Sequence, residues 1–236
     1  MRGKMLLFLA GILFAAAVCA DDVEGVPVKG KNGEVEAIRF DFQKTALDDD
    51  GYPAGWTYKG KFRTPDVRYA IEKDSELGPP VLVIRSPKAT GVIMADISGI
   101  DLAKYPIMRW RWKAVQLPAG ADARVKAKDD QGIAIYVGYG RFRQTSCSYT
   151  WETVTPKNLT GKAVYNGLVT VHWRSLRNQE DKLNTWYTEE VNLYQDLKEK
   201  LGKVPDGLAL SISSNSQYTG TDAEAMIDYI EFRRAK

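Results

Sequence analysis

Residues 106–115 read Pro-Ile-Met-Arg-Trp-Arg-Trp-Lys-Ala-Val, and this stretch decides the fold. Basic side chains at positions 109, 111 and 113 alternate with Trp110, Trp112 and Ala114. Because side chains of a strand point to opposite faces in turn, the stretch predicts a strand with one cationic and one aromatic face. Trp110 and Trp112 are expected to face the core of a β-sandwich. Arg109 and Arg111 are expected on the other face, as candidate ligand-binding residues.

Other segments of the chain show the same alternation or are rich in apolar and β-branched residues. These segments are expected to be strands: 36–43, 67–73, 81–85, 91–97, 131–138, 168–174, 207–213 and 226–233. One helix is predicted over 189–201, because Val191, Tyr194, Leu197 and Leu201 recur at helical spacing. Many short strands and one short helix predict an all-β fold, an antiparallel β-sandwich of the jelly-roll kind, in one domain over residues 36–236.

The N-terminal residues have the pattern of a secretory signal peptide. A basic start, an apolar run and the small residues Val18-Cys19-Ala20 predict cleavage after residue 20, and residues 21–35 are expected to form a flexible leader. The alternative is a lipoprotein that is acylated on Cys19. The apolar run is too short to span a bilayer, and no transmembrane segment is expected in the mature chain. The protein is therefore expected in the periplasm or outside the cell.

Charge and cysteine content narrow the function classes. Cleavage after residue 20 would leave 31 Lys and Arg against 30 Asp and Glu, which gives no support for nucleic-acid binding. It would also leave Cys147 as the only cysteine, so no internal disulfide is expected. Cys147 and His172, the only histidine, are expected to be structural. Their use as a catalytic pair is the alternative.

Four acidic residues stand out by position. Asp228 lies among apolar residues of the last expected strand, so it needs a partner, which is an Arg or a calcium ion shared with Asp41. Asp129 and Asp130 precede the strand at 131–138. They are expected to cap that strand or to meet the cationic face of the 106–115 strand, and a solvated turn is the alternative.

Three aromatic residues are candidates for ligand binding. Trp151, Tyr149 and Tyr139 lie near the Gly138-Tyr139-Gly140 segment, where no apolar periodicity surrounds them. Aromatic rings that carry a polar handle stack on sugar rings, and they also fill sandwich cores. We expect these three residues, together with Arg109, Arg111, Asp129 and Asp130, to bind the ligand.

Several motifs together resemble a bacterial exported family, domain of unknown function 3047, over about residues 38–233. The motifs are Phe40-Asp41-Phe42, Pro53-Ala54-Gly55-Trp56, Leu82-Val83-Ile84, Asp101-Leu102 before Pro106, Arg109-Trp110-Arg111-Trp112-Lys113, Asp129-Asp130, Leu201-Gly202, Thr219-Gly220, Ala225 and Asp228-Tyr229-Ile230. The pattern is also similar to galactose-binding-like β-sandwiches, which include carbohydrate-binding modules. That resemblance implies a structural calcium at Asp41 and Asp228, and a bacterial host.

The expected function is binding of a carbohydrate or envelope glycan without catalysis. No catalytic motif of a known hydrolase class is present, which favours a binding protein. Two alternatives remain open: a jelly-roll glycan hydrolase or lyase, and an envelope factor that binds another protein.

Overall fold

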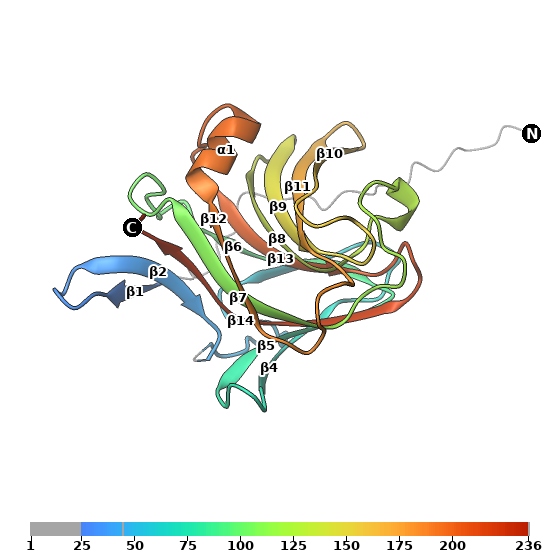
Figure 1. Ribbon diagram of the computed structural model, residues 1–236, viewed down its shortest axis with the longest axis horizontal. Helices are drawn as coiled ribbons and strands as arrows, with labels where there is room; N and C mark the ends of the chain where they lie inside the picture. Colours follow the sequence, from blue (N-terminus) through green and yellow to red (C-terminus); the bar gives the residue numbers. More distant parts are fainter. Residues whose placement is uncertain (1–24, 44, 236) are drawn as a thin grey trace, which may run out of the picture.

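Two β-sheets pack face to face in the computed structural model, which describes residues 25–43 and 45–235 (Figure 1). The expected signal peptide and its cleavage site lie outside the described residues. The first sheet has the order β1 (Val26–Lys29), β2 (Val35–Asp41), β14 (Asp222–Arg233), β5 (Pro80–Pro87), β4 (Arg68–Lys73). On the other edge of β14 lies β7 (Ile107–Gln116), which pairs in turn with β12 (Tyr187–Asn192).

The second sheet has seven strands. Their order is β10 (Thr160–Tyr165), β11 (Val169–Arg177), β9 (Gln144–Trp151), β8 (Gln131–Tyr139), β13 (Ala209–Asn215), β6 (Thr90–Asp96), β3 (Thr57–Gly60). The described pairs of both sheets are antiparallel except β11–β9, which is parallel. Helix α1 (Leu193–Leu201) and the 3-10 turn η1 (Lys126–Lys128) complete the elements. The predicted all-β sandwich with one short helix is confirmed.

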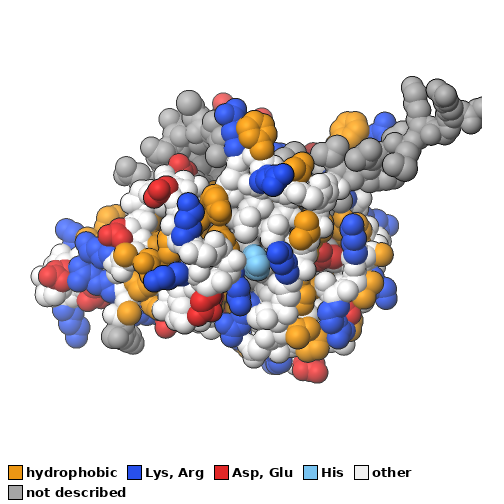
Figure 2. All heavy atoms as spheres, turned by 90° about the horizontal axis from the view of Figure 1, so that it is seen from above, with side chains coloured by type: hydrophobic (Ala, Val, Ile, Leu, Met, Phe, Trp, Pro, Cys, Tyr) orange, Lys and Arg blue, Asp and Glu red, His pale blue; other side chains and the backbone are white. Residues whose placement is uncertain are grey.

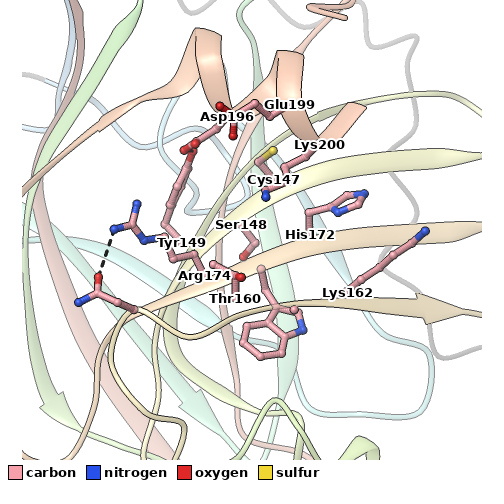
Figure 3. Close-up of a pocket in the computed structure, with 13 residues that line it drawn as sticks. Cys147, Ser148, Tyr149, Thr160, Lys162, His172, Arg174, Asp196, Glu199 and Lys200 are labelled. Atoms are coloured by element: carbon pink, nitrogen blue, oxygen red, sulfur yellow. Dashed lines mark hydrogen bonds between the residues drawn. The ribbon is translucent and has the colours of Figure 1, made fainter. Parts of the chain in front are cut away.

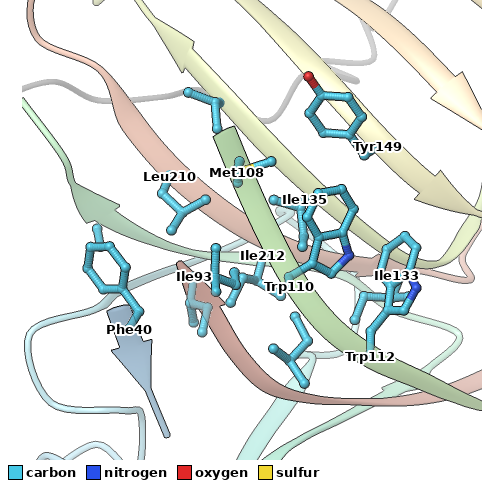
Figure 4. Packing of buried hydrophobic residues seen from close by; sticks show 14 of the residues in the cluster. Phe40, Ile93, Met108, Trp110, Trp112, Ile133, Ile135, Tyr149, Leu210 and Ile212 are labelled. Atoms are coloured by element: carbon cyan, nitrogen blue, oxygen red, sulfur yellow. The ribbon is translucent and has the colours of Figure 1, made fainter. Parts of the chain in front are cut away.

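The aromatic face of β7 forms the centre of the core between the sheets (Figure 4). Trp110 and Trp112 are both fully buried, as the alternation predicts. The ring of Trp110 lies 5.6 Å from that of Tyr149, and the ring of Trp112 lies 5.9 Å from that of Trp151. These contacts join β7 of the first sheet to β9 of the second. Burial of such large rings is the main source of sandwich stability.

The strand and helix boundaries differ from the sequence expectations in several places. Residues 26–29, expected in a flexible leader, form β1 and pair with β2. Residues 57–60, 144–151 and 160–165, which are not among the expected strands, form β3, β9 and β10. The helix begins at Leu193 instead of Glu189, because residues 187–192 pair with β7 as β12. The side chain of Asn192 accepts a hydrogen bond from Gln195 N and caps the helix, and Gly202 ends it in the left-handed conformation, as predicted.

A β-bulge in β14 changes the face on which Asp228 lies. Ile227 pairs with Trp112 and Tyr229 with Arg111, so Asp228 is the extra residue between two paired positions. Ala225 and Ile227 face the core before the bulge, and Ile230 and Phe232 face it afterwards. The prediction that Asp228 shares a face with Ile230 is therefore wrong. Its carboxylate lies on the outer face with Arg111.

Candidate functional site

The outer face of the first sheet holds basic side chains that are paired with acids, and we call it the ion-pair face. Its residues are Arg39, Asp74, Arg109, Arg111, Lys113, Asp228 and Glu231. Glu231 accepts hydrogen bonds from Arg39 at 2.6 and 2.9 Å and lies 3.8 Å from Arg109. Arg111 Nε donates to Asp228 at 2.7 Å. The structure thus places Arg109 and Arg111 in internal ion pairs, away from the other predicted ligand residues.

Lys113 is the most deeply buried basic residue of this face. Lys113 is buried in an ion pair with Asp74, and the ring of Trp186 lies 4.7 Å from the Lys113 ammonium. Trp186 Nε1 also donates to Asp74 at 3.2 Å. Burial opposes ionisation of Asp74, but hydrogen bonds led by that from Lys113 lower its pKa to about 2. The charges of this face therefore neutralise one another.

Asp41 and Asp228 lie on adjacent strands, as the calcium hypothesis requires, but their partners belong to the protein. Asp228 pairs with Arg111 and lies 3.4 Å from the amide nitrogen of Gln43, and Asp41 accepts from Gln43 N at 2.9 Å. Within residues 25–43 and 45–235, no three His, Cys, Asp or Glu side chains gather as a metal site would require. The ion-pair alternative is the one that the structure realises, and we do not propose calcium.

The three aromatic candidates do not form one exposed site. Trp151 is fully buried, and its Nε1 donates to Asn178 O at 3.2 Å, so the prediction that it binds a ligand is wrong. Tyr149 is 2% exposed and its hydroxyl donates to Asp196 at 2.6 Å. Tyr139 is half-buried against the core at the end of β8. Cys147, Tyr149 and Trp151 alternate with Ser146, Ser148 and Thr150 along β9, which sets the aromatic side chains inward.

The face of the second sheet that points away from the core carries small and hydroxyl-bearing side chains flanked by aromatic ones. One row of neighbours across the strands is Ser211, Tyr136, Ser148, Trp173 and Gly161. The next row is Ala209, Gly138, Ser146, Val171 and Ala163. Outside their own sheet, β8, β9 and β13 mainly contact helix α1 and the strands β5, β7 and β14 of the first sheet. These contacts are made by the opposite face of the second sheet, the one that faces the core.

This face is concave, and we call it the concave face. The Tyr165 hydroxyl at the end of β10 donates to Asp129, which precedes β8, although β11 and β9 lie between those strands. Such a contact requires the sheet to curl toward this side. Asp129 also accepts from Gln131 Nε2 at 2.7 Å, and Gln131 Oε1 accepts from Asn215 at 2.8 Å. A hydrogen-bonded polar network therefore crosses the concavity.

Asp129 and Asp130 belong to the concave face and not to the ion-pair face. Burial, reinforced by the charge of Asp130, raises the pKa of Asp129 to about 6 although Tyr165 donates to it. Asp130 accepts from the backbone nitrogens of Tyr218 and Thr219 at 3.1 and 2.6 Å. The prediction that these acids meet Arg109 and Arg111 is wrong. Asp130 instead fixes the loop that presents Tyr218.

Aromatic rings with accessible surface lie at the margins of the concave face. Tyr218 is 36% exposed, and the Lys61 ammonium lies 4.8 Å from its ring. Trp173 is half-buried on β11 over Gly161, where an added Cβ would lie 2.1 Å from the indole ring. The hydroxyls of Ser146 and Ser211 have no hydrogen-bond partner among the described residues, and both side chains are fully buried beneath this surface. The face thus offers rings for stacking at its margins.

A separate cavity of about 470 Å³ lies under helix α1, and we call it the helix pocket (Figure 3). Side chains from β9, β10, β11 and α1 line it, among them Tyr149, Lys162, His172, Arg174, Asp196 and Lys200. Arg174 donates to Asn158 at 3.1 Å, as the dashed line in Figure 3 marks. Its lining includes Tyr149, which points toward the core, and also Ser148, Gly161 and Trp173 of the concave face, so the pocket reaches both sides of the second sheet near its β10 edge.

Cys147 and His172 pair across β9 and β11 in this pocket, yet their protonation states do not suit nucleophilic catalysis. Burial and the charge of Asp196 raise the pKa of the Cys147 thiol to about 12. Burial and the charges of Lys162 and Lys200 lower the pKa of His172. Both shifts favour the neutral forms, whereas a catalytic pair needs the thiolate beside an imidazolium. The protonation states of Cys147 and His172 therefore do not favour nucleophilic catalysis by this pair.

Sequence reasoning missed Tyr165 and Tyr218, and it favoured a core position over ligand binding for Trp173 and Tyr136. Trp173 shares its parity with Val169 and Val171, so it resembles a core residue. The second sheet is apolar on both faces, because Val169 and Val171 lie in a cluster separate from the main core. Alternation therefore separates the two faces but does not say which one faces outward. The alternation of Ser146, Ser148 and Thr150 was the available signal.

The chain belongs to the family of proteins of unknown function DUF3047, whose model matches residues 54–231. This match confirms the resemblance noted from the motifs. No curated protein matches the chain.

Among solved structures, the chain is similar to carbohydrate-binding modules with the β-sandwich fold. One is a family 11 module from Clostridium thermocellum in complex with a β-1,3-1,4-mixed-linked tetrasaccharide, with 11% identity, 81% of this chain and 95% of that chain covered, and a TM-score of 0.41. Another is a non-crystalline cellulose-specific module, CBM28, with 13% identity, coverage of 92% and 99%, and a TM-score of 0.40.

An enzyme domain is among the similar structures as well. The xyloglucanase domain of NopAA from Sinorhizobium fredii, in complex with cellobiose, has 9% identity, coverage of 80% and 96%, and a TM-score of 0.42. Likeness at this level says nothing about a ligand of this chain, so the function must be argued from its own residues.

Proposed function

We propose that the protein binds a polysaccharide on the concave face without catalysis. The observation that carries this proposal is the combination, on one curved surface, of half-exposed aromatic rings with a hydrogen-bonded polar network. Sugars have apolar ring faces and many hydroxyls, so they need stacking surfaces and well-placed hydrogen-bonding groups together. Trp173 and Tyr218 supply the rings. The network of Asp129, Gln131 and Asn215 lies beside them.

The curvature suits a chain and not a flat crystal surface. Tyr165 and Asp129 approach each other across the strands, so the surface wraps around its ligand. A neutral ligand is favoured, because the row Ser211, Tyr136, Ser148, Trp173 and Gly161 across this face contains no charged side chain. Lys61, the nearest basic residue to Tyr218, donates to Gln217 at 2.6 Å.

Affinity electrophoresis in gels that contain soluble glucans, mannans or xylans tests this proposal. We expect retardation of the wild type in at least one gel and affinity about tenfold lower or worse for Trp173→Ala, a loss near 1.4 kcal/mol. Gly161→Ala is a subtler variant, because the added methyl displaces the Trp173 ring without removing it. Lys198→Gln, an exposed change on α1, is the matched control.

Two outcomes would contradict this function. If no gel retards the wild type, the ligand is not one of these polysaccharides, and the protein-partner alternative becomes the first candidate. If new reducing ends accumulate when wild-type protein is incubated with a retarding glycan, the protein is a hydrolase. Melting curves of each variant show whether a lost signal reflects unfolding.

We also propose that the protein acts outside the cytoplasm of a bacterial cell. The basic start, apolar run and small residues before position 21 support export. The intact mass of the protein recovered from a periplasmic extract should correspond to a chain that begins at Asp21. A mass that includes acyl groups on Cys19 would contradict simple cleavage. Among the described residues, no helix is both long and apolar enough to cross a membrane.

A further inference from the structure

Two lysines and the single histidine, from three different elements, line the helix pocket. Lys162 on β10 pairs in register with His172 on β11, and His172 pairs with Cys147 on β9, so all three point to the same side of the sheet. Lys200 enters from the last turn of α1. The charges of Lys162 and Lys200 both act on the His172 ring. Figure 3 shows these side chains on one side of the pocket, with Lys200 beside Cys147.

The acids that line the pocket have other partners. Asp196 accepts from the Tyr149 hydroxyl at 2.6 Å, and Glu199 accepts from the Gln195 amide at 2.7 Å. Among residues 25–43 and 45–235, no carboxylate forms an ion pair with Lys162 or Lys200. This differs from the ion-pair face, where each basic side chain has an acid. Asp196 and Glu199 therefore hydrogen-bond to neutral donors, and both lysines lack a direct ion-pair partner within the described chain.

The other side of the pocket offers further hydrogen-bonding groups. The Tyr149–Asp196 pair retains a free carboxylate oxygen, and Arg174 uses one nitrogen on Asn158 and leaves others available. These are groups that recognise hydroxyls. The volume of about 470 Å³ is within the range of small-molecule sites and accommodates a monosaccharide or disaccharide. Figure 2 shows the single histidine at the surface of the molecule, among lysine and arginine side chains.

We infer that the helix pocket is a second binding site, for a sugar that carries an oxyanion, either a carboxylate or a phosphate. The oxyanion lies between Lys162, His172 and Lys200, and the hydroxyls of the sugar ring meet Tyr149, Asp196 and Arg174. Ser148, Gly161 and Trp173 belong both to the pocket lining and to the concave face, whereas Lys162, His172 and Lys200 belong to the pocket alone. The inference does not rest on the proposed polysaccharide function, and a variant at Tyr218, outside the pocket lining, distinguishes failure of one site from failure of the other.

The single histidine allows a direct test by NMR. In a chain without a histidine tag, the ring signals of His172 are the only imidazole signals, and their pH titration gives its pKa. Galacturonate or glucose 6-phosphate should raise this pKa, because the oxyanion favours the imidazolium. A rise of about half a unit corresponds to roughly threefold tighter binding to the protonated form. The charged and titratable groups that face this ring are Lys162, Lys200, Glu199, Asp196, Arg174, Tyr149 and Cys147.

Control ligands separate the parts of the inference. A response to galacturonate alone identifies a carboxylate ligand, and a response to glucose 6-phosphate alone identifies a phosphate ligand, and both support the site. An equal response to neutral galactose would show that the pocket does not recognise the oxyanion, and this would contradict the inference. Acetate or inorganic phosphate that binds as tightly as the acidic sugars would show that the sugar ring is not recognised. No response to either acidic sugar would overturn the inference.

Variants locate the response in the pocket. Lys162→Gln and Lys200→Gln should each weaken binding of the acidic sugar about tenfold, or 1.4 kcal/mol. Lys198→Gln, in the same helix but outside the pocket lining, should not change it. An equal loss with Lys198→Gln would show that the response comes from general surface charge. Tyr218→Ala should leave the His172 response intact while it weakens polysaccharide binding, which distinguishes failure of this site from failure of the concave face.

Discussion

The outer faces of the two sheets have opposite designs. On the ion-pair face, long charged side chains cover the strands, and each basic group has an acid, as in the pairs Arg111–Asp228 and Lys113–Asp74. On the concave face, small residues such as Gly138 and Ser146 project little from the strands, and aromatic rings lie at the margins. A surface whose charges are neutralised internally has little left to offer a ligand. The comparison therefore directs the search for function to the second sheet.

The largest expected effect on stability is in the hydrophobic core between the two sheets. Trp112→Ala should lower the free energy of unfolding by about 3–5 kcal/mol, because it removes a fully buried ring that joins the two sheets. Urea denaturation followed by circular dichroism measures this loss. If the cost were below about 1 kcal/mol, the two sheets would not be held together through β7 and β9, and the comparison of their outer faces would lose its basis.

The two faces should respond to pH with opposite sign. Burial raises the pKa of Asp129 to about 6, so the folded state holds this proton more tightly than the unfolded state, in which the pKa is 3.8. Its contribution to stability is full below about pH 4 and is lost as pH rises through 6. Asp74 has a pKa lowered to about 2, so its contribution is full above pH 4 and is lost as pH falls toward 2.

The variants Asp129→Asn and Asp74→Asn test this contrast. The difference in unfolding free energy between wild type and Asp129→Asn should fall by about 3 kcal/mol from pH 4 to pH 7, which is the value of a two-unit shift. The difference for Asp74→Asn should instead shrink as the pH is lowered below 4. Chemical denaturation at each pH gives both values. Slopes of the same sign for the two variants would contradict the contrast between the faces.

The ion pair at the bulge gives a smaller effect. Arg111→Ala should destabilise the protein by about 1–3 kcal/mol, because Asp228 stays buried and, among the described residues, keeps only Gln43 as a polar side-chain partner. In an Asp228→Asn background the same change should cost much less. A double-mutant cycle in urea measures the coupling. Equal costs in both backgrounds would show that Arg111 acts through packing on Trp186 and Tyr229 and not through Asp228.

Sequence patterns predict the fold better than the site, and β7 and β9 show why. In β7 a large apolar residue alternates with a charged one, and burying the charge would be so costly that the two faces are assigned without further information. In β9 the alternation is between aromatic residues and serines, and serine is compatible with either face. The prediction of an exposed Trp151 failed for this reason. Trp110 and Trp112 were placed correctly.

The candidate site was less predictable because it depends on curvature and on a bulge. Tyr165 and Asp129 are 36 positions apart in the sequence and on non-adjacent strands, and only the curl of the sheet brings them together. The face of Asp228 is set by one extra residue in β14, which no periodic pattern shows. Local alternation encodes the face of a residue. It does not encode how far a sheet bends.

The smallest expected effect is at Arg109, and it bears most directly on the comparison. Arg109 lies 3.8 Å from Glu231, which keeps closer hydrogen bonds from Arg39 at 2.6 and 2.9 Å, so Glu231 remains paired when Arg109 is removed. Arg109→Ala should therefore change the unfolding free energy by less than about 0.5 kcal/mol, as for other exposed ion pairs. Retardation in polysaccharide gels should be unchanged as well, since the concave face lies on the other sheet. A loss of retardation with an unchanged melting curve would place the ligand on the ion-pair face, and the assignment of the two faces would have to be reversed.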